Sequence, residues 1–199
     1  MIFKYDSVLD IKLIQSHIKI KKMKILDFGC GTGVWSQNNL KNKNLSKVIL
    51  YDKNKELIKI LKKKYSNKKV EINFNFKNII RKNNYNLLIL SSVIQYMNIS
   101  EFKKLIAIIC HKKKKKLFII IADIPKFSRA FEFILMPFLN LKRFFFILKI
   151  IFKHEYKKLH YYLHKKKDFN FLKKRFKLSY IENIHDIKYL RYSLILKLK

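Results

Sequence analysis

Short apolar runs, separated by polar and lysine-rich stretches, divide the chain into alternating predicted strands and helices. Five runs have the length and residue types of buried strands: residues 24–28, 47–51, 70–76, 85–90 and 117–122. Apolar residues at helical spacing predict amphipathic helices at residues 7–20, 34–40, 55–65 and 100–109. Ser100 is the expected N-cap of the last of these. A short helix over residues 168–176 and strands over 177–184 and 192–199 complete the pattern, which is typical of an α/β domain.

The sequence has only three glycines, and all three lie at alternate positions directly after the first predicted strand. They stand in the run Asp27-Phe28-Gly29-Cys30-Gly31-Thr32-Gly33. Glycine lets a chain turn sharply, adopt positive φ and approach a ligand with no Cβ in between. The helix predicted from Val34 directs its free amide groups and its dipole toward the same place. This loop is therefore the strongest candidate for a ligand-binding site.

The run from Asp27 to Gly33 resembles motif I of the class I S-adenosylmethionine-dependent methyltransferases. The dinucleotide-binding fingerprint G-x-G-x-x-G fits less well, because Val34 occupies the position of its third glycine. The resemblance covers most of the chain and implies a Rossmann-like three-layer sandwich. Its sheet would be mostly parallel and seven-stranded, with a final antiparallel strand pair and a helical insertion after the fifth strand. It also implies a single methyltransferase domain over residues 1–199, with residues 126–167 as a helical cap or insertion, and S-adenosylmethionine as the cofactor.

The resemblance assigns cofactor-binding roles to the glycine loop. The amino-acid end of the cofactor would lie against the backbone of the loop, at Gly29, Cys30, Gly31 and Gly33. Asp27 would support the loop or receive the cofactor's ammonium group through water. A helix before the first strand, predicted over Ser7 to Ile20, would cover one end of the cofactor site or simply pack on the sheet.

Three further residues are predicted to contact the cofactor. Asp52 ends the second predicted strand, where a carboxylate accepts hydrogen bonds from both ribose hydroxyls, although a helix cap is the alternative. Asn75 follows the third strand, where the family commonly has an acidic residue that binds the adenine amino group, and an Asn carbonyl accepts the same bond. Ser91 begins the Ser91–Met97 segment, which resembles the motif IV region. Ser91, Gln95 and Tyr96 would then face the methyl group and the nucleophile, unless the segment is only a polar turn.

No catalytic residue is assigned from the sequence. Tyr96, His154 and His160 are the candidates, since a single histidine is able to act as a general base. His160 and His164 lie one helical turn apart, but no third ligand has a convincing spacing, so no metal site is predicted. Surface histidines beside lysines are the plainer interpretation of this group.

The charge and amino-acid composition bear on whether the protein binds nucleic acid or a membrane. A formal net charge of +33 ordinarily indicates nucleic acid or an anionic membrane surface. Almost all of the 46 basic residues are lysines, however, and the abundance of Asn, Ile, Phe and Tyr is typical of an AT-rich genome. Arginine, the residue preferred for bidentate recognition of phosphates and bases, is scarce, so a nucleic-acid partner is not expected. Two cysteines without metal-ligand spacing, and no signal-peptide pattern over residues 1–20, favour the cytoplasm.

The segment 131–152 is rich in Phe, Ile and Leu, but charged residues interrupt it. Its apolar runs are shorter than the ~20 residues that a membrane-spanning helix needs. Two interpretations remain: a helical cap over the active site, and an interfacial helix that contacts the inner face of the membrane peripherally. Both hold together if the acceptor is a lipid or a lipid-linked sugar.

The sequence thus predicts a methyltransferase that acts on a small-molecule, sugar or lipid-linked acceptor by in-line methyl transfer. An RNA or other nucleic-acid methyltransferase is one alternative, although the amino-methylating motif with Pro-Pro and an aromatic residue is absent after the fourth strand. A non-enzymatic membrane-associated module that retains the fold is the other. The acceptor and the oligomeric state are not predicted.

Overall fold

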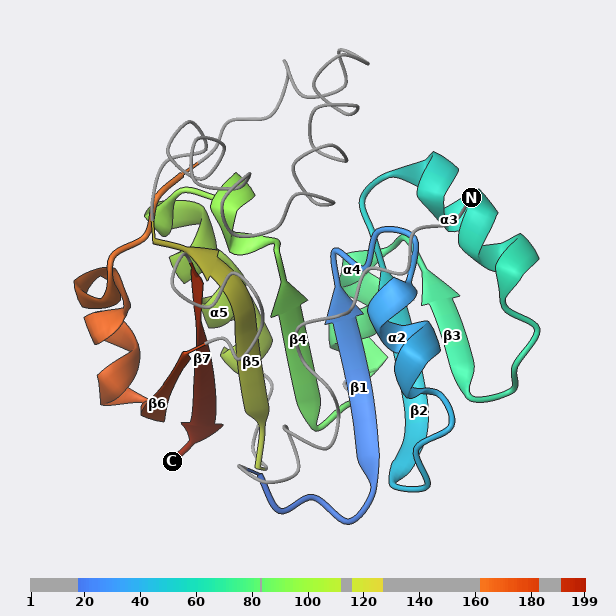
Figure 1. The fold of residues 1–199 in the computed structure, drawn as a ribbon, viewed down its shortest axis with the longest axis horizontal. Helices are drawn as coiled ribbons and strands as arrows, with labels where there is room; N and C mark the ends of the chain where they lie inside the picture. The colour runs from blue at the N-terminus through green and yellow to red at the C-terminus, as the bar shows by residue number, and fades with distance from the viewer. Residues whose placement is uncertain (1–17, 83, 112–115, 127–161, 183–190) are drawn as a thin grey trace, which may run out of the picture.

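The computed structural model describes residues 18–82, 84–111, 116–126, 162–182 and 191–199. Within these residues a seven-stranded sheet of order β3-β2-β1-β4-β5-β7-β6 forms the centre of the molecule (Figure 1). Its strands are β1 (Met23–Phe28), β2 (Leu45–Tyr51), β3 (Val70–Asn73), β4 (Leu87–Ser91), β5 (Phe118–Pro125), β6 (Phe176–Glu182) and β7 (Arg191–Leu198). The helices are α2 (Val34–Asn39), α3 (Lys55–Lys64), α4 (Phe76–Lys82) and α5 (Ile99–His111), with 3₁₀ helices η1 (Ile94–Tyr96) and η2 (Lys166–Lys174).

Strands β1 to β5 are parallel to one another, and β7 runs antiparallel to both of its neighbours, β5 and β6. The chain moves outward from β1 through β2 to β3 and then returns to place β4 on the other side of β1. Ligands in open α/β sheets bind beyond the carboxyl ends of the strands at such a reversal. The carboxyl ends of β1, β2, β4 and β5 all point upward in Figure 1, so this edge is the expected position of a site.

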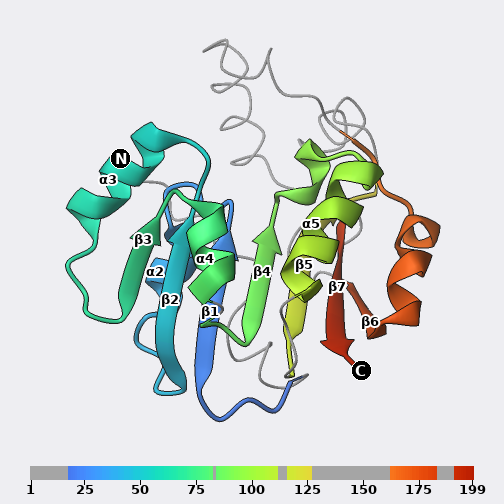
Figure 2. The same ribbon diagram turned by 180° about the vertical axis from the view of Figure 1, so that it is seen from behind.

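The helices cover both faces of the sheet and make three layers. Helices α4 and α5 lie over one face in Figure 2, while α2 lies behind the sheet in the same view. Alternate residues of each central strand enter the two hydrophobic cores: Leu88 and Leu90 belong to one, Leu87 and Ile89 to the other. A strand buried on both faces has a continuous apolar sequence, as β4 and β5 do. The predicted fold class is confirmed.

The third strand is shorter than the prediction of residues 70–76. It ends at Asn73, and helix α4, which the sequence pattern did not indicate, begins at Phe76. Oδ1 of Asn73 accepts a 2.8 Å hydrogen bond from the backbone N–H of Asn75, and Oδ1 of Asn75 accepts one of 3.2 Å from the N–H of Asn78. These side chains replace the strand ladder by a turn and a helix cap, which is the usual effect of Asn at such positions.

The predicted cap of α5 is also wrong. Ser100 lies inside the helix, and Asn98 is the cap: its Oδ1 accepts a 2.9 Å bond from the N–H of Glu101. The Glu101 carboxylate in turn accepts a 2.8 Å bond from the N–H of Asn98, which completes a capping box. The signal for it, Asn-x-x-Glu before an apolar helical stripe, is present in the sequence.

Several predictions concern residues outside the described ranges. The helical insertion over residues 126–167 and the segment 131–152 within it fall there almost entirely, as does most of the predicted helix Ser7 to Ile20. That helix does not extend to its predicted end, because residues 18–20 are not helical. Among the residues with described positions, no helix is long and apolar enough to cross a membrane.

Candidate functional site

The glycine loop leaves β1 and is fixed to β2 by the main chain. The backbone N–H groups of Gly29 and Cys30 both donate to the carbonyl oxygen of Tyr51, at 2.7 and 3.0 Å. Gly29 passes so close to the loop after β4 that an added Cβ would lie 2.7 Å from a methyl carbon of Val93. The glycine loop is therefore held at the carboxyl edge of the sheet by hydrogen bonds to β2 and by close packing against the loop after β4.

Gly31 differs from Gly29 and Gly33 because it faces open space. It has a φ of 56°, which L side chains rarely adopt, and a Cβ added there would meet no atom within 4 Å. Its N–H donates a 3.0 Å hydrogen bond to Oδ2 of Asp52. The loop thus presents bare backbone beside a carboxylate, which lets a ligand approach the main chain closely and meet a hydrogen-bond acceptor there.

Asp52 sits where the sequence predicts it, at the carboxyl end of β2. Its Oδ1 accepts a 2.9 Å bond from the N–H of Asn54, and Asn54 itself caps α3. Each carboxylate oxygen accepts one backbone N–H in this way and keeps a second lone pair. The carboxylate is thereby oriented by two fixed donors and retains the capacity to accept two hydroxyl groups.

Asp27 is a different kind of carboxylate. It is 2% exposed and accepts a 2.7 Å hydrogen bond from the Ser36 hydroxyl of α2. Burial raises its pKa to about 6, against the lowering effect of the Ser36 hydroxyl and with a further rise from the charge of Asp52. Of the two predicted roles for Asp27, this position fits support of the loop, because the carboxylate is turned into the protein and held to α2.

Helix α3 braces the glycine loop from outside, which the sequence did not indicate. The Tyr65 hydroxyl donates a 2.6 Å bond to the carbonyl oxygen of Gly33, and the Lys64 ammonium donates a 3.0 Å bond to that of Thr32. Burial raises the pKa of Tyr65 to about 12, with further contributions from Asp27 and Cys30. The hydroxyl therefore remains a donor throughout the neutral range.

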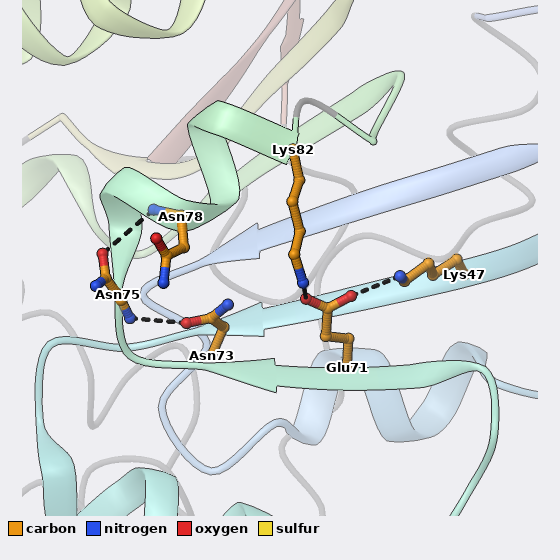
Figure 3. Close-up of polar contacts among 6 residues, drawn as sticks. All are labelled: Lys47, Glu71, Asn73, Asn75, Asn78 and Lys82. Carbon is orange, nitrogen blue, oxygen red and sulfur yellow. Dashed lines mark hydrogen bonds and ion pairs between the residues drawn. The ribbon is translucent and has the colours of Figure 1, made fainter.

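Asn75 lies at the turn between β3 and α4. Figure 3 shows it between Asn73 and Asn78, with its side chain engaged as the cap of α4. Beneath this turn the rings of Phe28, Tyr51 and Phe76 pack together, with centroids 4.8 to 5.4 Å apart. Next to the asparagine turn, Glu71 of β3 forms ion pairs with Lys47 at 2.5 Å and Lys82 at 3.3 Å, which tie β2, β3 and α4 together (Figure 3).

The end of β4 and the turn after it form the other side of this edge. Ser91 is the last residue of β4, and Gln95 and Tyr96 lie in η1, Gln95 being 5% exposed. Ser92 donates a hydrogen bond from its hydroxyl to Oδ2 of Asp123, at the corresponding position of β5. The sequence singled out Ser91, Gln95 and Tyr96 here, and the Ser92–Asp123 pair became visible only in the structure.

Of the three histidines considered in the sequence, only His164 lies within the described residues. His154 and His160 lie outside the described ranges. His164 is 5% exposed rather than a surface histidine, and its Nε2 lies 3.1 Å from the carbonyl oxygen of Ile94 and 2.9 Å from that of Met97. The N–H of Tyr162 donates a further 2.8 Å bond to the Gln95 carbonyl. Residues 162–165 are thereby fastened to the turn after β4.

Proteins of known structure share this architecture. Magnesium protoporphyrin IX methyltransferase from Synechocystis PCC 6803, solved with bound SAH, has a TM-score of 0.54 and 17% identity, over 94% of this chain and 78% of its own. A SAM dependent methyltransferase from Aquifex aeolicus has a TM-score of 0.61 and 14% identity, over 97% and 92%. N-methyltransferase NodS from Bradyrhizobium japonicum WM9, in complex with S-adenosyl-l-homocysteine, has a TM-score of 0.55 and 9% identity, over 94% and 83%. At these identities the likeness concerns the fold.

The sequence also matches a model of a protein family. The family model described as "Methyltransferase domain" matches residues 19–184, which contain the glycine loop, Asp52 and every strand from β1 to β6. No curated protein matches the sequence. The chain therefore belongs to the methyltransferase domain family, and its fold is the one seen in the S-adenosylmethionine-dependent methyltransferases named above, in agreement with the resemblance of its glycine loop to motif I.

Proposed function

We propose that this chain transfers a methyl group from S-adenosylmethionine to a small-molecule, sugar or lipid-linked acceptor, beyond the carboxyl ends of β1, β2, β4 and β5. The single observation that carries the proposal is the environment of Gly31. A Cβ added at Gly31 would meet no atom within 4 Å, and the Gly31 N–H donates a hydrogen bond to Asp52. The residues present fit the cofactor at this point.

Each end of the cofactor has a matching set of residues in this proposal. Gly29, Cys30, Gly31 and Gly33 accommodate the amino-acid end against the backbone, and Asp27 holds the loop through Ser36. Asp52 accepts the ribose hydroxyls with the lone pairs that Gly31 and Asn54 leave available. Asn75 and the turn around it lie at the adenine end, and Ser91 lies toward the methyl group.

The chemistry asks little of the protein beyond positioning. S-adenosylmethionine supplies a methyl group already activated by the sulfonium. The chain must hold the acceptor atom about 3 Å from the methyl carbon, in line with the departing sulfur. Residues at the end of β4 and in η1, including Tyr96, are in position to contribute, because the same carboxyl edge carries the glycine loop and Asp52.

A small or lipid-linked acceptor is favoured by the nature of the positive charge. Lysine dominates it, whereas arginine is the residue suited to bidentate contacts with phosphates and bases. One of the structural neighbours is named for a porphyrin substrate, which is consistent with a small acceptor in this fold. We also propose a single domain over residues 1–199, in which the apolar segment 131–152 supplies the contact with an apolar acceptor or with the membrane surface.

The test joins binding and transfer. Isothermal titration with S-adenosylhomocysteine should give saturable binding by the wild type and none by Gly31→Val, since the valine side chain fills the open space and disfavours the positive φ. Ser46→Ala is the matched control, because the Ser46 hydroxyl binds the Met23 carbonyl at the opposite end of the sheet. Radiolabelled S-adenosylmethionine and a fractionated extract of the source cells then identify the acceptor class. Retained affinity in Gly31→Val contradicts the cofactor assignment, and label in nucleic acid contradicts the acceptor class.

A further inference from the structure

Ser92 follows the last residue of β4, and Asp123 lies within the neighbouring parallel strand β5, where the pairing of β5 with β7 is irregular between Ile121 and Ile124. The pairing of β4 with β5 ends at Ser91 and Ala122, so Ser92 and Asp123 are the residues that follow this last pair in the two segments. Ser92 has a φ of 55° and Asp123 a φ of 64°, and they are the only non-glycine residues of the described ranges with positive φ. Backbone strain of this kind persists where the surrounding structure imposes it, and it is concentrated at functional sites.

The two residues with strained backbones are also joined by hydrogen bonds. The Ser92 hydroxyl donates to Oδ2 of Asp123, and the Ser92 N–H donates a 3.1 Å bond to the Ala122 carbonyl. The Asp123 N–H donates a 3.4 Å bond to the Ser193 hydroxyl of β7. Asp123 is 6% exposed, whereas Ser92 is half-buried. The hydroxyl is therefore the outer member of the pair and the carboxylate the inner one.

A second observation in the same loop concerns Gln95, three residues after Ser92. Its side chain is 5% exposed, and its Oε1 has no hydrogen-bond partner within the part of the chain that the structure describes. Buried polar atoms are normally satisfied, so an unsatisfied carbonyl oxygen calls for a functional reason. A ligand with an N–H or O–H group would satisfy it. The Ser92–Asp123 pair calls for the same type of ligand, because it ends in a group that accepts a proton.

Resting on the proposed function, we infer that Ser92 and Asp123 form the proton-accepting end of the acceptor site, and that the methyl acceptor is a hydroxyl or an amine. The acceptor oxygen or nitrogen forms its bond to the methyl carbon as the carbon–sulfur bond breaks, and the electron pair of that bond stays on sulfur. The acceptor's proton moves to Oγ of Ser92 while the Ser92 hydroxyl proton moves to Asp123. The carboxyl group returns this proton to water after the product leaves. Gln95 accepts a hydrogen bond from a second donor on the acceptor.

A carboxylate acceptor would need no such pair, since it carries no proton to remove. The same residues would then serve only to join the segment after β4 to β5. The two interpretations differ in what they predict for Ser92→Gly. Glycine adopts positive φ without strain, so a merely structural role predicts a variant with an equal or higher melting temperature and an unchanged transfer rate.

The experiment compares Ser92→Gly, Ser92→Ala and Asp123→Asn with the wild type, and Glu71→Gln serves as a carboxylate control on β3. S-adenosylhomocysteine binding and melting temperature are measured first. Initial rates with radiolabelled S-adenosylmethionine are then measured against pH, using the lipid and small-metabolite fractions of the source-cell extract as acceptors. The labelled product is finally treated with mild alkali, which releases the methyl group of an ester as methanol and leaves methyl ethers and methylamines intact.

The inference predicts unchanged S-adenosylhomocysteine binding, a stable Ser92→Gly, and a transfer rate in Asp123→Asn lowered by about 100- to 10,000-fold. The residual rate of Asp123→Asn should rise steadily with pH, because hydroxide replaces the missing base. A wild-type rate in Ser92→Gly and Asp123→Asn, or label released as methanol, overturns the inference and leaves the proposed function in place. Absence of S-adenosylhomocysteine binding, or of any transfer by the wild type, overturns the proposed function and the inference with it.

Discussion

The backbone N–H of Gly31 donates a 3.0 Å hydrogen bond to Oδ2 of Asp52, which joins the glycine loop after β1 to the end of β2. The two residues are 21 positions apart in the sequence, and the parallel pairing of β1 with β2 brings them together. One carboxylate thus both fixes the loop and remains able to bind hydroxyl groups. On the proposed function, a substitution at this point should affect both the stability of the fold and the affinity for the cofactor.

Asp52→Asn should weaken cofactor binding more than it weakens the fold. The amide keeps one oxygen to accept the N–H of Gly31 or Asn54, but its NH₂ group accepts nothing. Hydrogen bonds to charged groups contribute about 1.5 to 3 kcal/mol, so the affinity for S-adenosylhomocysteine should fall by about 10- to 100-fold. Titration calorimetry measures this, with Asp168→Asn in η2 as the control. Equal affinities for Asp52→Asn and the wild type would remove Asp52 from the site.

Asp27 should make the stability of the protein fall as pH rises from about 4 to about 6. Its pKa is raised from 3.8 to about 6 in the folded chain, so the folded state holds this proton more tightly than the unfolded state over that range. The resulting loss amounts to about 3 kcal/mol and is complete above the folded pKa. Urea unfolding of the wild type and Asp27→Asn between pH 4 and pH 7 measures the difference. A difference that does not change with pH would contradict the buried, raised pKa.

Tyr65→Phe tests whether α3 braces the glycine loop. The variant loses the 2.6 Å bond from the hydroxyl to the Gly33 carbonyl, which also accepts a 2.9 Å bond from the N–H of Gln37. Because the carbonyl keeps a partner, the loss of stability should be only about 1 kcal/mol. S-adenosylhomocysteine affinity should fall as well, since the loop carbonyls become less constrained. Tyr180→Phe, which removes an exposed hydroxyl bonded to the Lys166 carbonyl, is the control and should leave affinity unchanged.

Asn98→Ala and Ser100→Ala distinguish the observed cap of α5 from the predicted one. Asn98 accepts the N–H of Glu101, so its replacement should destabilise the protein by about 1 kcal/mol. Ser100 is exposed inside the first turn, and its replacement should have almost no effect on thermal unfolding. The reverse order of melting temperatures would restore Ser100 as the cap. Cofactor binding should be the same in both variants, because neither contacts the glycine loop.

The features predicted most accurately from the sequence are those that depend on a local pattern of residues. The central strands, the loop at Gly31 and the carboxylate at Asp52 could all be predicted. The period of apolar residues, the placement of glycines and the spacing between motifs are properties of the sequence itself. Element ends were less predictable. At Asn73 the side chain competes with the strand ladder for hydrogen bonds, and at Asn98 it caps a helix; the period of apolar residues records neither, although the Asn-x-x-Glu signal of the second is present in the sequence.

The sequence by itself therefore determined the fold class, the methyltransferase family and the position of the glycine loop, because glycine content and apolar period restrict the backbone locally. Only the tertiary structure decided which distant groups meet. It brought Tyr65 to Gly33, fastened His164 to the turn after β4, and set Ser92 beside Asp123 with both residues at positive φ. These contacts depend on the lateral order of the strands and on desolvation within the folded chain, and no local pattern encodes either of them.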